Sequence, residues 1–436
     1  MHRITFISKI FLAAILLLFV IFMSGCLFQQ HPANQSSNMS PEISVTNTSQ
    51  NETMRSIHIA QPLWKYTYPS GDWVQTVSVD RLGNAIIVGT RFSDLYYFNR
   101  TGMVVWDNEG ISNSEAISTI RGNQDRHYGL SGVGVSADGK YIGIVSASGQ
   151  NSYYYRNSTP VVNNEWATVY SKGQNVAISD DGRYYVAGIG YGNNNNVLFY
   201  DLLHLNPHFY RGWTNHETWH YTTYNSISDS GLTPVVSDPH DPVGVHVAIS
   251  ADGQYVAAVS EDSRVYYFNQ SGSLLWNNIT GRSLENVAMS ADGKYIAVAS
   301  RDHNIYYYDA TGTRSWNYST GSIVKSVAVN RDGNYIAAGS DDSHVYLFDR
   351  NGTLLWEYAT GGPVESVSIS RNGQTIAAGS DDHLVYCFNP TGDLLWKYTT
   401  GDKVRSVSVS GDGEYVAAGS WDGNVYFFNR RGSDIG

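Results

Sequence analysis

The sequence of 436 residues has little charge and almost no cysteine. Charged residues make up 15% of the chain, against about 25% in a typical soluble globular protein. The two cysteines, Cys26 and Cys387, exclude a disulfide framework and a four-cysteine zinc site. Lys and Arg form no cluster larger than a pair such as Arg430-Arg431, and the net charge is −11. We therefore expect no nucleic-acid partner.

The abundant residues favour strands and turns. The chain contains 42 Gly and 32 Tyr, and 42% of its residues are hydrophobic, which is enough to bury a large core. This composition predicts an all-β protein.

The N-terminus has the order of a secretory signal. Arg3 and Lys9 precede an apolar run over residues 10–23, and Ser24-Gly25-Cys26 follows. The segment Met23-Ser24-Gly25-Cys26 resembles the lipobox of prokaryotic lipoproteins, which implies that residues 1–26 are a signal peptide and that Cys26 carries the lipid. The alternative is an uncleaved signal anchor, because residues 10–28 just suffice to cross a bilayer about 30 Å thick. Either way, the rest of the chain is expected outside the cytoplasmic membrane.

Residues 27–57 are rich in Asn, Ser, Thr and Gln, so we expect a disordered tether. Ten Asn-x-Ser/Thr triplets occur here and further on, and they are candidate glycosylation sites. They are Asn34, Asn38, Asn47, Asn51, Asn99, Asn157, Asn269, Asn278, Asn317 and Asn351. The alternative explanation is that such a composition produces the triplets by chance.

From residue 247 the chain repeats with a period of 40. The turn glycines Gly253, Gly293, Gly333, Gly373 and Gly413 keep this spacing, and so do Trp276, Trp316, Trp356 and Trp396. Less regular copies surround Gly83, Gly139 and Gly182, which gives eight copies in all. Residues 107–132 and 189–246 exceed the template, and function in repeat proteins often lies on such insertions.

Each copy alternates polar and apolar residues, the period of strands. One copy predicts strands at 366–370, 375–380, 385–388 and 394–398, which form one antiparallel blade. Residues 58–436 are therefore predicted to form an eight-bladed β-propeller, or a seven-bladed one if an irregular copy forms no blade. The last copy ends at Phe428 without an outer strand, so residues 62–68 are expected to supply it. One Trp then falls to each blade: Trp64, Trp106, Trp166, Trp219, Trp276, Trp316, Trp356 and Trp396.

Residues 367–388 resemble the WD-repeat pattern, including the turn aspartates Asp262, Asp302, Asp342, Asp382 and Asp422. Residues 391–401, with Trp396, are similar to the Gly-x-x-x-Trp docking motif of quinoprotein (PQQ)-like propellers. The resemblance implies the fold over residues 62–436 but no particular activity. By analogy it suggests an envelope-assembly lipoprotein as one alternative. A quinone-dependent oxidoreductase is a lesser alternative, because that class uses a vicinal disulfide and the chain has no Cys-Cys pair.

The segment His216-Glu217-Thr218-Trp219-His220 matches H-E-x-x-H, which binds zinc when it lies on a helix. Trp219 falls at the outer-strand position, however, so the register predicts a strand. His216 and His220 remain weak candidates for a metal site, with Asp238 or Asp241 as a further ligand. The alternative is that the histidines of this region are solvated loop residues: His204, His208, His216, His220, His240 and His246.

Other repeated residues are explained by the fold. The Asp-Gly turns contain Asp138, Asp252, Asp292, Asp332 and Asp412. Aspartate is typical of such turns, because its side chain bonds the nearby backbone. The tyrosine runs are expected mostly in the core, with a smaller share on a surface for carbohydrate or protein. We expect no catalytic residues and no cofactor. The sequence predicts a monomeric, membrane-anchored binding or scaffold propeller at the cell surface with a protein or carbohydrate ligand.

Overall fold

The computed structural model describes residues 59–68, 71–91, 94–107, 129–146, 151–155, 160–164, 171–191, 194–202, 218–223 and 244–432. All of them belong to one compact unit, Ser56–Gly436. The predicted signal (1–26) and tether (27–57) lie outside these ranges. Within them, no helix has the length and apolar character needed to span a membrane.

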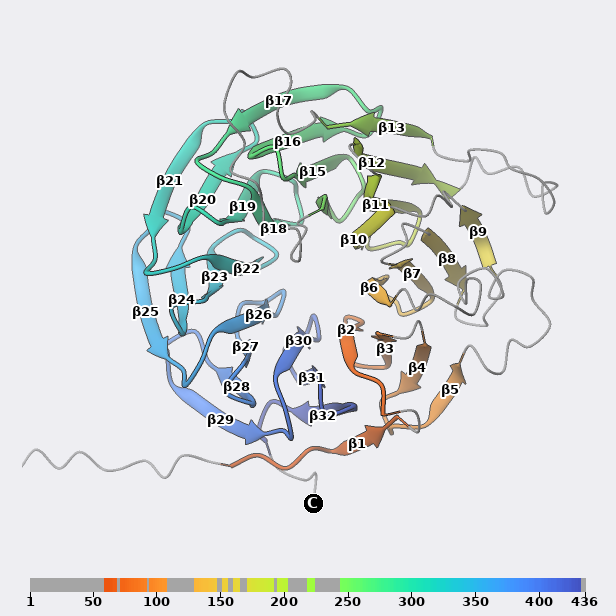
Figure 1. Cartoon of the computed structure of the whole chain (residues 1–436), viewed down its shortest axis with the longest axis vertical. Coiled ribbons are helices and arrows are strands. Elements are labelled where there is room, and N and C mark those ends of the chain that lie inside the picture. Colours follow the sequence, from red (N-terminus) through yellow and green to blue (C-terminus); the bar gives the residue numbers. More distant parts are fainter. Residues whose placement is uncertain are drawn as a thin grey trace, which may run out of the picture. The chain divides into compact units, whose positions relative to one another are not determined.

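The described strands form eight four-stranded antiparallel sheets, which confirms the eight-bladed β-propeller and excludes the seven-bladed alternative. We number the blades along the chain, from blade 1 (β2 to β5) to blade 8 (β30 to β32 with β1). Successive innermost strands are neighbours, and the strand of blade 8 also neighbours that of blade 1, so the blades form a closed ring (Figure 1).

The innermost strands are β2 (Val74–Val79), β6 (Leu130–Val135), β10 (Ser171–Ile178), β14 (His246–Ile249), β18 (Leu284–Met289), β22 (Val324–Val329), β26 (Val364–Ile369) and β30 (Val404–Val409). The second strands are β3 (Ala85–Thr90), β7 (Tyr141–Ser146), β11 (Tyr184–Tyr191), β15 (Tyr255–Val259), β19 (Tyr295–Ser300), β23 (Tyr335–Ser340), β27 (Ile376–Ser380) and β31 (Tyr415–Ser420).

The third strands are β4 (Leu95–Asn99), β8 (Asn151–Tyr155), β12 (Asn194–Asp201), β16 (Arg264–Asn269), β20 (Asn304–Asp309), β24 (His344–Asp349), β28 (Leu384–Phe388) and β32 (Asn424–Asn429). The outer strands are β1 (Trp64–Thr67), β5 (Val104–Asp107), β9 (Pro160–Asn164), β13 (Trp219–Thr222), β17 (Leu274–Ile279), β21 (Arg314–Ser319), β25 (Leu354–Ala359) and β29 (Leu394–Thr399).

The N-terminal strand closes the ring, as predicted. β1 pairs antiparallel with β32, with Trp64 opposite Phe427 and Thr67 opposite Asn424. Its Trp64 ring stacks on Phe427 at 5.2 Å between centroids. Blade 8 is thereby completed by the first strand of the propeller.

The predicted insertion over residues 189–246 includes residues that belong to the strands of blade 3. β11 continues to Tyr191, and both β12 and β13 lie inside the range. The expectation was wrong there because strands of eight residues extend blade 3 beyond the template. Of the predicted insertion over residues 107–132, the structure describes only the two ends, where β5 ends at Asp107 and β6 begins at Leu130; residues 108–128 lie outside the described residues.

The core lies between neighbouring blades rather than within one. A typical cluster joins Ile305 and Tyr307 of blade 5 to Val327, Ile336 and Phe348 of blade 6. Small residues on the second strands permit this approach, because a Cβ at Gly339 would lie 2.5 Å from Cγ1 of Val364 in the next blade. The third-strand tyrosines Tyr306, Tyr307 and Tyr308 are all buried, which confirms their expected place in the core.

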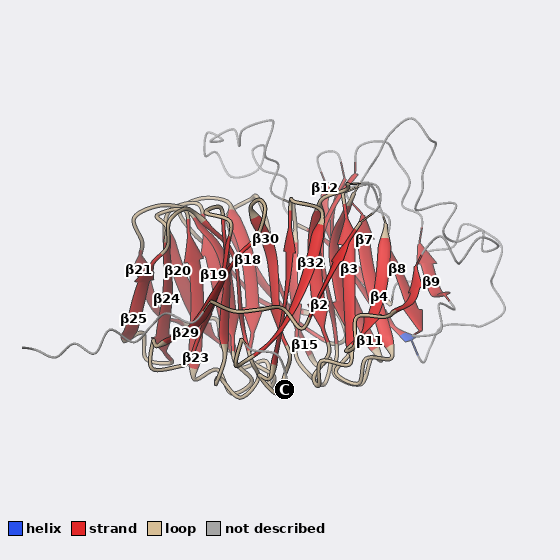
Figure 2. Ribbon diagram, turned by 90° about the horizontal axis from the view of Figure 1, so that it is seen from below, coloured by secondary structure: helices blue, strands red, loops and turns tan. Residues whose placement is uncertain are grey.

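Each blade has two ends, which we call the upper and lower faces after their positions in Figure 2. The turns between the second and third strands and the connections between blades lie on the upper face. The turns between the first and second strands, and those between the third and outer strands, lie on the lower face. All eight predicted turn glycines of the lower face have positive φ, between 68° and 80°.

Backbone hydrogen bonds link the first lower-face turns of all eight blades into a ring. Each turn donates an amide to a carbonyl of the next turn over 2.8 to 3.2 Å, and Asp412 closes the ring by donating to the carbonyl of Arg81. The residues whose amides or carbonyls take part are Arg81, Ala137, Asp180, Ala251, Ala291, Arg331, Arg371, Gly411 and Asp412. These hydrogen bonds hold the eight turns in place around the lower end of the propeller axis.

Candidate functional site

The structure gives no support to a zinc helix at H-E-x-x-H. His216 lies outside the described residues, and His220 is exposed on the outer strand β13 of blade 3. Trp219 occupies the outer-strand position, as the register predicted. Asp238 and Asp241 lie outside the described residues. Within the described ranges, no three His, Cys, Asp or Glu side chains are grouped to hold a metal ion.

His246 is not a solvated loop residue, so the expectation for this histidine was wrong. It begins the innermost strand β14, and its Nδ1 is buried without a hydrogen-bond partner among the described residues. Burial lowers the pKa of His246 to about 4. The imidazole of His246 is therefore neutral near pH 7. The remaining histidines of this group, His204, His208 and His240, lie outside the described residues.

The modification candidates fall partly within the described chain. Cys26, Asn34, Asn38, Asn47, Asn51 and Asn157 lie outside it. Asn317 and Asn351 are exposed, on β21 and on a lower-face turn. The Oδ1 atoms of Asn99 and Asn269 accept turn hydrogen bonds from the amides of Met103 and Ser273, and Nδ2 of Asn278 donates to the carbonyl of Gly312. Asn317 and Asn351 are thus the most accessible described acceptors.

The predicted docking role of the tryptophans is confirmed in six blades. Each indole packs on a glycine of the next blade and donates its Nε1 hydrogen to a carbonyl there over 2.9 to 3.2 Å. The pairs are Trp64 with Gly102, Trp219 with Gly272, Trp276 with Gly312, Trp316 with Gly352, Trp356 with Gly392 and Trp396 with Gly432. Trp106 pairs with Tyr97 in the same register.

Trp166 was wrongly assigned to the outer strand of blade 2. β9 ends at Asn164, and Trp166 lies outside the described residues. Val162 pairs with Tyr153 where Trp276 pairs with Tyr267 in blade 4. The register of blade 2 therefore places Val162, and not a Trp, at the position that Trp276 has in blade 4.

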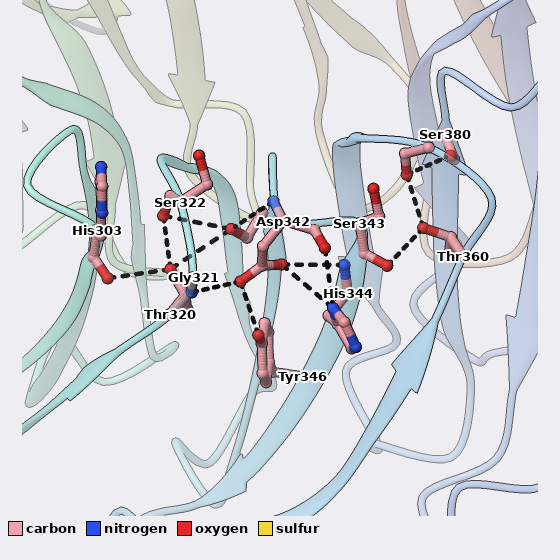
Figure 3. Close-up of polar contacts among 12 residues, drawn as sticks. His303, Thr320, Gly321, Ser322, Asp342, Ser343, His344, Tyr346, Thr360 and Ser380 are labelled. Carbon is pink, nitrogen blue, oxygen red and sulfur yellow. Dashed lines mark hydrogen bonds and ion pairs between the residues drawn. The ribbon is translucent and has the colours of Figure 1, made fainter.

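The repeated upper-face aspartates hold neighbouring blades together (Figure 3). Oδ2 of Asp342 accepts a hydrogen bond from the Tyr346 hydroxyl at 2.8 Å and another from the amide of Gly321 in the preceding blade-to-blade connection at 2.6 Å. Asp302, Asp382 and Asp422 repeat both contacts. Burial acts to raise the pKa of Asp302, but hydrogen bonds led by the one from Tyr306 hold it below its usual value. These carboxylates have their partners within the fold.

Four of the five predicted Asp-Gly turns show the expected turn chemistry; in the fifth, Oδ1 of Asn330 and not of Asp332 accepts the turn amides. Oδ1 of Asp292 accepts from the hydroxyl of Ser290 at 2.7 Å and from the amide of Lys294 at 3.1 Å. Asp138, Asp252 and Asp412 repeat this arrangement.

Charged side chains that differ from blade to blade gather on the upper face near the axis. The second residues of the innermost strands in blades 5 to 8 alternate in sign: Glu285, Lys325, Glu365 and Arg405. Glu285 pairs with Arg301, and Lys325 lies 3.8 Å from Asp341. Glu365 and Asp381 pair across to Arg405 and Lys403 of blade 8. Burial raises the pKa of Glu365, and the charge of Arg405 offsets this only in part.

An aromatic stack continues this charged row at the seam between blades 8 and 1. Trp73 and Trp421 stack at 4.8 Å between centroids, with Arg91 over Trp73 at 4.3 Å and Arg405 over Trp421 at 5.0 Å. Nε1 of Trp421 and Oδ1 of Asp381 are buried without partners among the described residues. Sequence reasoning missed this stack, although Trp421 stands out where the preceding copies have Arg301, Asp341 and Asp381.

We define the upper-face row as Glu285, Arg301, Lys325, Asp341, Glu365, Asp381, Lys403, Arg405, Trp73 and Trp421. Trp and Arg are enriched among the residues that contribute most to protein binding, and the row brings Trp73 and Trp421 together with Arg405. The row is the candidate binding site.

Fold and docking motifs together define a β-propeller repeat protein, and its repeats are similar to WD and PQQ-like repeats. Residues 227–377 match the family described as outer membrane protein assembly factor BamB, and residues 369–436 match the lambda-carrageenase β-propeller domain. No curated protein matches the chain significantly.

Among solved structures, the chain is similar to Sqt1 of Chaetomium thermophilum bound to the N-terminus of ribosomal protein L10. The TM-score is 0.62 at 15% sequence identity, covering 82% of this chain and 97% of that one. This likeness supports the propeller fold.

Proposed function

We propose that the protein is a non-catalytic binding propeller that holds a protein partner on its upper face. The observation that carries the proposal is the upper-face row, where charge changes from blade to blade on a backbone that repeats. Closing the ring requires no such alternation, because the Asp–Tyr–Gly contacts and the docking tryptophans already join the blades.

Two further observations support the proposal. The upper-face aspartates that recur in blades 4 to 8 each accept a hydrogen bond from a tyrosine hydroxyl of the same blade. The similar propeller Sqt1 was solved with a protein segment bound, so a propeller of this fold can hold a peptide.

Partner capture by matched charge variants tests the role of the upper face. The variant Arg282→Glu with Asp402→Lys changes two upper-face side chains beside the row, and Arg431→Glu with Glu414→Lys is the lower-face control. Partners from detergent-solubilised membranes are expected to be retained by the control and lost by the upper-face variant, with equal melting temperatures. Equal retention by both variants would contradict the proposal.

The location of this propeller is part of the proposal: we place it on the outer face of the cytoplasmic membrane or at the cell surface, anchored through residues 1–26. The order of charged start, apolar run and Cys26 supports this. Cys26→Ser is expected to abolish lipid labelling and to alter processing of the precursor. A variant that stays membrane-bound at its normal size would show a signal anchor instead.

Envelope assembly is the second candidate, because the BamB family match covers residues 227–377. Identification of outer-membrane assembly proteins among the captured partners would select it over a general scaffold role. A quinone site of the vicinal-disulfide type does not fit the residues present. Cys387 is the only cysteine of the propeller, and it is buried in β28, where burial raises its pKa.

A further inference from the structure

The backbone ring of the lower face brings eight equivalent side-chain positions around the propeller axis. Going from blade 1 to blade 8 they are Arg81, Ala137, Asp180, Ala251, Ala291, Arg331, Arg371 and Gly411. Three of them are arginines and one is an aspartate, while the other four carry no polar side chain. These eight positions therefore carry three cations and one anion, and the residues that follow six of them in the turns are aspartates: Asp138, Asp181, Asp252, Asp292, Asp332 and Asp412.

Among these eight positions only Asp180 carries a carboxylate, and this carboxylate is already paired with an arginine. Both oxygens of Asp180 in blade 3 accept hydrogen bonds from the two terminal nitrogens of Arg371 in blade 7. These blades lie on opposite sides of the ring, so this pair crosses the axis. Arg331 reaches the same carboxylate only at 3.5 Å. Because Arg331 shares this one carboxylate with Arg371, most of the five N–H donors of Arg331 have no acceptor among the described residues.

Arg81 contributes the third guanidinium group of the lower axial end. It is exposed and makes no ion pair with any described residue. Its stem and that of Arg371 both pass over Gly411, where an added Cβ would lie 3.0 Å from Cγ of Arg81 and 3.0 Å from Cδ of Arg371. The absence of a side chain at Gly411 thus lets the two arginines gather at one edge of the axis.

We propose that this lower axial cluster binds an oxyanion, a phosphate or carboxylate group that approaches from the lower face. Arg81 and Arg331 supply the donors to the anion, and the Asp180 carboxylate, which is paired with Arg371 across the axis, competes with the anion for Arg331. The planar guanidinium fork suits both oxyanions, since it donates two parallel hydrogen bonds to either. Arg331, with its side chain 47% exposed, and Arg81 are both accessible from solvent.

Calorimetric titration of the purified full-length protein with inorganic phosphate and, separately, with succinate at constant ionic strength tests the site and distinguishes the two groups. Arg81→Gln and Arg331→Gln are each expected to weaken binding about three- to tenfold, and the double variant to abolish it. Arg282→Gln on the upper face is the matched control and should bind as the wild type does. Asp180→Asn removes the competing carboxylate and should tighten binding.

The proposal fails if neither anion binds the wild type at millimolar concentration. It also fails if the double variant binds as tightly as Arg282→Gln does. A third contrary result concerns Asp180→Asn: a lower melting temperature with no gain in anion affinity would show that the Asp180–Arg371 pair only braces the ring.

Discussion

At the scale of single residues, the carboxylate of Asp342 shows how a polar group can join two blades. Its Oδ2 receives the Tyr346 hydroxyl from its own blade and the Gly321 amide from the connection that precedes it. A buried carboxylate that loses one of its donors is costly, whereas a hydroxyl without a partner contributes little when it is removed.

The first prediction compares two tyrosines on this basis. Tyr346→Phe is expected to lower the free energy of unfolding by about 1 to 2 kcal/mol, because Asp342 loses a donor. Tyr68→Phe should change it by less than about 0.5 kcal/mol or stabilise the protein, since the Tyr68 hydroxyl is buried without a partner among the described residues. Urea unfolding followed by fluorescence measures both, and equal losses would refute the assigned role of the Asp342 contact.

His246 predicts a pH dependence. Its folded pKa is about 4 and its ordinary value 6.5, so between these values the unfolded chain binds a proton that the folded protein does not. Stability contributed by the neutral imidazole is complete above about pH 6.5 and is lost as the pH falls towards 4, by as much as about 3 kcal/mol. His246→Gln should flatten this part of the profile, and His220→Gln, exposed on β13, should leave it unchanged. Parallel profiles for wild type and His246→Gln would contradict the assignment.

At the scale of the blade, the docking of an outer-strand Trp on a glycine of the next blade is the repeated joint. Gly312 has φ +83°, and a Cβ there would lie 2.8 Å from Cγ of Trp276. An alanine at this position therefore incurs both backbone strain and a clash with the indole.

Gly312→Ala is predicted to lower the free energy of unfolding by at least about 3 kcal/mol. Gly71→Ala serves as the control, because Gly71 has φ +64° and no atom within 4 Å of an added Cβ, so only the backbone cost of about 1 to 2 kcal/mol applies. Denaturant unfolding separates the two effects. If both variants lose the same stability, contact with Trp276 does not hold the blades.

Blade joints also show where sequence reasoning succeeds. A period of 40 with one Gly and one Trp per copy predicted strands, docking contacts and eight blades, because each is a local pattern repeated in register. Trp166 was misassigned since its copy has irregular spacing, and His246 was taken for a loop residue since burial depends on neighbours distant in sequence. The Asp180–Arg371 pair joins residues 191 positions apart, which no local pattern reveals.

At the scale of the whole molecule, closure is the feature on which the other contacts depend. Without β1, blade 8 loses its outer strand, and Phe427 loses the stacked ring of Trp64. A deletion that extends to residue 70 also removes Tyr68, whose side chain is buried. Loss of one buried large aromatic costs about 3 to 5 kcal/mol, against a total stability of about 5 to 15 kcal/mol.

Deletion of residues 1–70 is therefore predicted to give an aggregating or unfolded chain, while deletion of residues 27–56 should leave the melting temperature unchanged. Size-exclusion chromatography and thermal unfolding of the two variants provide the comparison. A monomeric, cooperatively folding fragment 71–436 would show that the ring holds together without its N-terminal strand.

Closure by β1 also sets the order in which the molecule is completed during synthesis. Thr67 bonds Asn424, a residue 357 positions later, so the strand of the propeller that is made first finds its partner only when almost the whole chain has been made. Contacts so distant in sequence form slowly, and unpaired strand edges invite association with other chains in the meantime. Up to that moment the growing chain exposes β1 without its partner, so its most vulnerable period is the interval between the emergence of residue 67 and that of residue 424.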